Sequence, residues 1–99
     1  MNKLQRTILN NAHEDEYLWV VISDICEIFG CSRTEAFLLL MSEIEFISRR
    51  SDVHILKSDR INSPTFIEEI DQKGMKLLTL EDLEYMEGRP VFFISTVGV

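Results

Sequence analysis

The sequence has no long apolar run, few basic side chains and only two cysteines. A membrane-spanning helix needs about 18 or more consecutive apolar residues, and no stretch here meets that length. The opening segment, MNKLQRTILNN, is too polar for the apolar part of a secretory signal. Cys26 and Cys31 are too few and too close for a disulfide framework and fit thiols kept reduced inside a cell. We therefore expect a cytoplasmic protein without a membrane partner.

Basic charge is scarce throughout the chain. The 99 residues contain 10 Lys and Arg against 17 Asp and Glu, which gives a formal net charge of −7. The acidic excess occurs in both halves, with eight acidic and five basic side chains in residues 1–50 and nine and five in residues 51–99. Affinity for nucleic acid comes largely from Lys and Arg that displace counterions. Neither half therefore offers the basic surface that DNA or RNA binding normally needs.

Motifs for catalysis and for cofactor binding are missing as well. The sequence contains no glycine-rich phosphate loop, no G-x-S-x-G elbow and no H-E-x-x-H helix. The two cysteines lack the tight C-x2-C spacing of a zinc knuckle, and His13 and His54 lie far apart in sequence. We expect no enzymatic activity, no cofactor, no metal and no small-molecule substrate.

The length of the chain allows one domain, residues 1–99, built around one core. Hydrophobic spacing, capping residues and turn residues predict alternating helices and strands. In chain order these are a helix over 3–11, a strand over 17–22, helices over 23–29 and 33–49, a strand over 53–57, helices over 64–73 and 80–87, and a strand over 91–94.

The segment ISDICEIFGCSRTEAFLLLMSEI, residues 22–44, fits the pattern of a helix-turn-helix. Gly30 stands where the turn needs a left-handed residue, and Ser32 with Glu35 forms an S-x-x-E capping box for the second helix. In DNA-binding proteins such a turn presents the second helix to the major groove. The inward positions of the pattern are small or apolar: Ile25, Cys26, Phe29, Cys31, Ala36 and Leu39.

The order of elements predicts an α+β fold, a winged-helix-like helix-turn-helix core with a small antiparallel sheet and two additional C-terminal helices. Residues 1–57 would form the core with the first wing strand. Residues 58–99 would form a helical insertion and the final strand. With a helix before the helix-turn-helix and the strands over 53–57 and 91–94 after it, the order of elements resembles that of a winged helix.

The segment LWVVISDICEIFGCSRTEAFLLLMSEI is similar to the helix-turn-helix of small enterobacterial transcriptional regulators of the CaiF/GrlA type. The resemblance covers residues 17–44, about a quarter of the chain. It implies a winged-helix regulator of transcription, but it concerns mostly core positions, which carry the fold better than the function. The matching residues are Trp19, Val21, Ile22, Ile25, Phe29, Ala36, Leu40, Ser42 and Glu43.

The outward positions of the second helix are poorly suited to reading bases. Base edges are read mainly by Arg, Lys, Asn and Gln. Among the outward positions of the second helix, only Arg33 is one of these residue types. Phe37, Leu38 and Met41 form an apolar group that is more typical of a protein interface. If the chain binds nucleic acid instead, the candidate residues are Ser32, Arg33, Thr34, Arg49 and Arg50.

Two interpretations of this apolar group fit the sequence equally well. It can contact a protein partner, or it can be part of the core, covered by residues 64–99. We expect a small regulatory protein that acts mainly through protein contacts, as a homodimer, an adaptor or an inhibitor. A sequence-specific transcription regulator is the alternative, disfavoured by charge. An acidic mimic of nucleic acid ranks last because the acidic residues are scattered.

Overall fold

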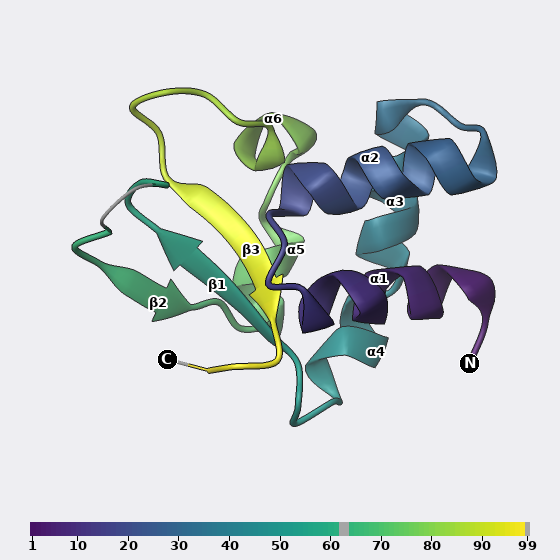
Figure 1. The fold of residues 1–99 in the computed structure, drawn as a ribbon, viewed down its shortest axis with the longest axis horizontal. Coiled ribbons are helices and arrows are strands. Elements are labelled where there is room, and N and C mark those ends of the chain that lie inside the picture. Colours follow the sequence, from purple (N-terminus) through teal and green to yellow (C-terminus); the bar gives the residue numbers. More distant parts are fainter. Residues whose placement is uncertain (62–63, 99) are drawn as a thin grey trace.

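The computed structural model describes residues 1–61 and 64–98, and these form an α+β fold. Four helices gather on one side, and the sheet lies on the other side with two short helices beside it (Figure 1). In chain order the elements are α1 (Lys3–His13), α2 (Leu18–Phe29), α3 (Arg33–Ser42), α4 (Ile44–Ser48), β1 (His54–Ser58), β2 (Ile67–Glu69), α5 (Gln72–Lys76), α6 (Leu80–Leu83) and β3 (Val91–Ser95).

The first helix confirms the prediction for residues 3–11, whereas the strand predicted over 17–22 is wrong. Those residues form the first half of α2, which starts after Tyr17 rather than at Ser23. Ser23 lies inside the helix, where its hydroxyl donates to the carbonyl of Trp19 at 3.0 Å. The β-branched and aromatic composition suggested a strand, but a helix brings all its buried side chains to one side. These are Leu18, Val21, Ile22 and Ile25.

The third helix is shorter than predicted. It starts at Arg33 with the expected capping box, in which Ser32 accepts from the Glu35 backbone and Glu35 accepts from the Ser32 backbone. It ends at Ser42 instead of continuing to residue 49. After Glu43 the chain starts the separate helix α4, which turns Ile44 and Ile47 into the core.

The sheet has the strand order β2-β1-β3, and both pairs are antiparallel. The strands predicted over 53–57 and 91–94 are confirmed as β1 and β3, which pair directly from His54 opposite Ser95 to Ser58 opposite Val91. The helix predicted over 64–73 is wrong, because its middle forms β2. Ser63, which directly precedes that predicted helix, lies outside the described residues.

Asp59 explains why the chain turns back into β2. Its carboxylate accepts from the backbone of Thr65 and of Phe66 and from the Thr65 hydroxyl, and its backbone N–H donates to the Phe66 carbonyl. These bonds close a loop between β1 and β2 in place of a helix start. A side-chain contact of this kind, over six and seven residues, competes with regular secondary structure and leaves no mark in hydrophobic spacing.

Two short helices follow β2 and lead to β3. Asp71 caps α5, and Gly74, the residue that follows the helix predicted over 64–73, lies inside α5. The helix predicted over 80–87 is confirmed at its start, where Thr79 and Asp82 form a capping box, but it covers only Leu80–Leu83. Two short helices are therefore present in this part of the chain, but α5 lies almost wholly beyond the helix predicted over 64–73, and α6 covers only the start of the helix predicted over 80–87.

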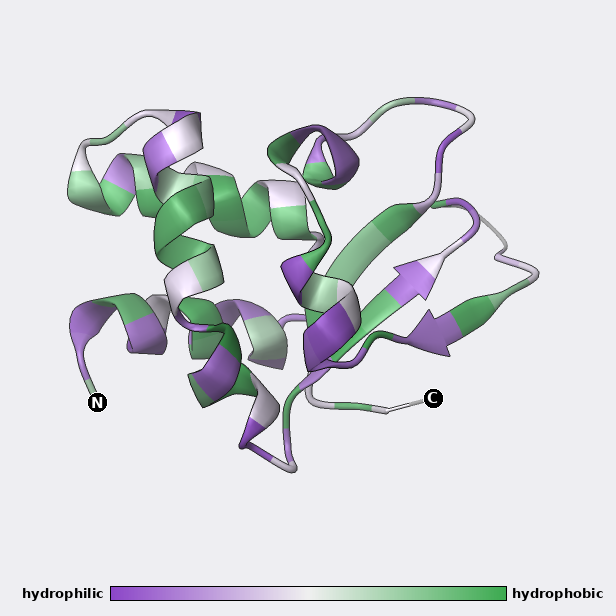
Figure 2. Cartoon of the chain, turned by 180° about the vertical axis from the view of Figure 1, so that it is seen from behind, coloured by the Kyte–Doolittle hydropathy of each residue, from purple (hydrophilic) through white to green (hydrophobic). Residues whose placement is uncertain are grey.

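One hydrophobic core joins the two parts of the chain. Helices α1 and α3 and strand β3 pack around α2, and the apolar stretches of α2 and α3 lie against each other (Figure 2). Met75 and Leu83 from α5 and α6 belong to the same cluster as Ile25 and Leu40. Among the described residues, no helix is both long and apolar enough to span a membrane.

Gly30 offers a test of the turn between α2 and α3. Its φ is +63°, and a Cβ atom there would meet nothing within 4 Å. Gly30→Ala should therefore cost only the price of a left-handed backbone, about 1–2 kcal/mol of unfolding free energy. Gly30→Asn should cost less, because Asn tolerates this conformation. Urea denaturation measures both; equal stability of Gly30→Ala and the wild type would contradict this turn geometry.

Candidate functional site

The apolar residues predicted to form an interface lie on α3, outside the side of the helix that is fully buried. Ala36 and Leu40 are fully buried and fix the inward side of the helix. Leu38 lies opposite them and is 60% exposed. Phe37 and Met41 are half-buried and pack against the core. We call Phe37, Leu38 and Met41 the outer face of α3, since residues three and four apart are neighbours on a helix.

The three residues of the apolar group do not all fit the same interpretation. Phe37 and Met41 each bury part of their surface in the core, as the core interpretation requires. Leu38 remains open to solvent, as an interface requires. The outer face therefore consists of one protruding leucine between two side chains that the core holds in place.

Arg33, the strongest candidate for reading a base, is occupied within the chain. Its Nε and Nη2 donate to Glu84 Oε1 at 2.9 and 2.6 Å. Nη1 donates to the Ser23 hydroxyl at 2.9 Å, and Nη2 also reaches the Trp19 carbonyl at 3.3 Å. The guanidinium thus ties α3 to α2 and to the segment after α6. Binding a guanine would require breaking the pair with Glu84.

The other nucleic-acid candidates are spread over two places. Ser32 uses its hydroxyl to cap α3, and Thr34 is exposed in the first turn. Arg49 follows α4 and makes only a long contact of 3.8 Å with Glu45. Arg50 donates from Nε and Nη2 to the two oxygens of Asp52 at 3.1 and 2.9 Å. The five residues therefore do not form one basic surface.

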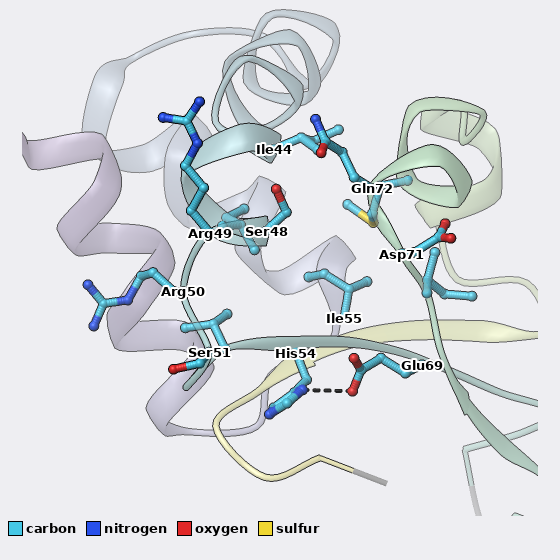
Figure 3. A pocket seen from close by; sticks show the side chains of 14 residues that line it. Ile44, Ser48, Arg49, Arg50, Ser51, His54, Ile55, Glu69, Asp71 and Gln72 are labelled. Atoms are coloured by element: carbon cyan, nitrogen blue, oxygen red, sulfur yellow. Dashed lines mark hydrogen bonds and ion pairs between the residues drawn. The ribbon is translucent and has the colours of Figure 1, made fainter.

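A cavity of about 490 Å³, which the sequence did not indicate, lies between α4, β1 and α5 (Figure 3). Isoleucines from α4 and β1 line it together with Met75, and polar groups stand at its edge. His54 Nδ1 and Glu69 Oε1 are 2.7 Å apart at this edge. The side chains of Arg49 and Arg50 point away from the middle of the cavity in this view.

Several polar groups around this cavity already have partners inside the chain. Asp71 accepts from the backbone of Gly74, and Glu69 is paired with His54. Across residues 1–61 and 64–98, no three His, Cys, Asp or Glu side chains come together as a metal site would require. Sequence reasoning missed the cavity because it forms only once β1 and α5 come together, and a helix was predicted where β2 precedes α5.

Aromatic side chains gather near Arg33, beside the start of α3. The rings of Tyr17 and Trp19 stack in parallel with centroids 4.3 Å apart. The ring centroid of Tyr85 lies 5.2 Å from that of Trp19. Trp19 is half-buried and Tyr85 is 51% exposed. The interaction of Arg33 with Glu84 places its charge in the same region. Trp, Tyr and Arg are the residue types most enriched in the energetic centres of protein interfaces.

Comparisons with protein-family models, with curated proteins and with solved structures found no match to this chain.

The pair of Arg50 with Asp52 makes a prediction about pH. The Arg50 guanidinium holds the pKa of the Asp52 carboxyl below its usual value, mainly through their hydrogen bonds. Because the folded pKa is lowered, the pair stabilises the fold above the ordinary Asp pKa of about 3.9, and this contribution is lost as pH falls through the lowered value. In Arg50→Gln, an NMR titration should show the Asp52 pKa rising towards its ordinary value. An unchanged pKa would contradict the pairing.

Proposed function

We propose that this chain is a small regulatory protein that acts through protein contacts, with the outer face of α3 as its contact surface. The observation that carries the proposal is that the Leu38 side chain is 60% exposed, whereas its neighbours Phe37 and Met41 pack against the core. In the free chain, Leu38 exposes apolar surface to water, which is unfavourable. A partner that covers this leucine removes that surface from water.

Charge around the outer face favours a protein over DNA. Glu35 stands one turn before Leu38 and is exposed, and Glu45 follows in α4 with 66% of its side chain exposed. These carboxylates would repel phosphate, and the whole chain carries a net charge of −7. A protein with an apolar centre and basic residues around it would complement both features. The partner can be a different protein, for which this chain is an adaptor or inhibitor, or a second copy of the chain.

The arrangement of elements supports a winged-helix-like interpretation of the fold. Helices α2 and α3 meet across Gly30, and an antiparallel sheet follows them. We infer that the chain is a variant of this fold in which β2, α5 and α6 are inserted in the sequence between β1 and β3. These two strands pair directly with each other in the sheet. The resemblance of residues 17–44 to CaiF/GrlA-type regulators of transcription, expected from the sequence, is part of this proposal.

Sequence-specific DNA binding is the second candidate, and one observation favours it. The turn at Gly30 and the capped start of α3 have the form in which DNA-binding proteins present a helix to the major groove. Arg33 stands at that start, but its interaction with Glu84 would have to be exchanged for a base. The candidate requires binding that weakens steeply with salt and depends on Arg33. The acidic surface makes us rank it second.

The proposal predicts that one substitution on the outer face abolishes partner binding. The tagged chain and its Leu38→Glu and Leu77→Glu variants would be produced in the source cell, with a second copy carrying a different tag. Leu77 lies after α5 and is 81% exposed, so Leu77→Glu makes the same chemical change on another surface. Both variants should keep their stability within about 0.5 kcal/mol, because both leucines are exposed.

After nuclease treatment, a protein should co-purify with the wild type and with Leu77→Glu, and Leu38→Glu should lose it. Recovery of the second tagged copy would identify the partner as a homodimer subunit. Equal recovery with all three chains would contradict the proposal. A partner that nuclease removes would favour DNA binding instead.

A further inference from the structure

The end of α2 brings the only two cysteines of the chain together. Gly30 takes a left-handed conformation, and the N–H of the next residue, Cys31, donates to the carbonyl of Cys26 at 3.2 Å. In this type of helix ending, the two residues joined by that bond commonly have their side chains in contact. The geometry of the turn, more than the short sequence separation, therefore pairs the two thiols.

Both thiols are free and half-buried, and both pack against the core. Cys31 Sγ lies 3.9 Å from the Ile25 carbonyl oxygen, which keeps its side chain on the inner side of the turn. Desolvation raises the pKa of the Cys31 thiol, and the adjacent Cys26 thiol raises it further. The Cys31 sulfur therefore stays protonated at neutral pH, and its reactivity increases as the solution becomes alkaline.

We propose that Cys26 and Cys31 form a dithiol site that reacts with low-molecular-weight disulfides, such as oxidised glutathione, and closes to an intramolecular disulfide. This site is separate from the outer face of α3, and the inference does not depend on the proposed function.

The reaction takes place in two exchanges. In the first, one cysteine thiolate attacks a sulfur of oxidised glutathione, the glutathione S–S bond breaks, and one glutathione thiolate leaves. In the second, the other cysteine thiolate attacks the protein sulfur of this mixed disulfide and releases the second glutathione thiolate. The two protons lost by the protein thiols are taken up by the two glutathione thiolates. The protein dithiol is oxidised and one molecule of oxidised glutathione is reduced.

The position of the pair gives the reaction a structural consequence. Cys26 belongs to the last turn of α2, and Cys31 immediately precedes Ser32, the cap of α3. A disulfide between them would join the end of one helix to the start of the next. We expect it to restrict the angle between α2 and α3 without changing the helical content of the chain.

Intact-mass measurement tests the proposal directly. The folded wild type would be incubated with oxidised glutathione under mildly alkaline conditions, beside the Cys26→Ser and Cys31→Ser variants. The wild type should lose two hydrogen atoms and keep no glutathione, whereas each single variant should stop at a stable mixed disulfide. Stable glutathione adducts on the folded wild type would overturn the proposal, because they would show that the second exchange does not occur.

A comparison with the unfolded chain separates the folded geometry from simple sequence proximity. The same reaction in denaturant reports how fast two thiols at this spacing close without the turn. Closure of the mixed disulfide should be faster in the folded protein, because the turn holds the sulfurs together. Slower closure in the folded protein would also overturn the proposal. Circular dichroism of the two serine variants checks that they are folded when compared.

Discussion

The burial of one side of α2 is the constraint on which the rest of the structure depends. Leu18, Val21, Ile22 and Ile25 are fully buried among α1, α3 and β3. Burying four such side chains stabilises a fold by about 6–12 kcal/mol before entropy is counted. Intrinsic strand preferences span only about 1 kcal/mol. In a strand, residues 18 and 22 would face away from 21 and 25, so only a helix can bury all four together.

This central helix also determines what α3 can present to the outside. Because α3 uses Ala36 and Leu40 to cover α2, Leu38 must point the other way. The network of Arg33 with Glu84 then holds the start of α3 against the segment after α6 and pairs the Arg33 guanidinium with a carboxylate of the same chain. Helix α3 therefore offers a leucine and carboxylates to the outside. This combination underlies our preference for a protein partner.

The sequence predicted local features well and long-range ones poorly. The capping box at Ser32 and the left-handed Gly30 were readable because they depend on neighbouring residues. The replacement of a predicted helix by β2 could not be read from the sequence, since it depends on hydrogen bonds of Asp59 with residues further along the chain. For the candidate site, the outward direction of Leu38 followed from helical geometry. The pairing of Arg33 depended on tertiary contacts that no spacing reveals.

Direct contact at Leu38 is the central claim, and site-specific photo-crosslinking tests it most directly. A photoreactive amino acid would replace Leu38 in one chain and Leu77 in another, and both would be irradiated in the source cell. The account predicts a crosslinked product at position 38 that protease destroys and nuclease leaves intact, and no such product at position 77. A product of nucleic acid at position 38, or none there, would contradict it.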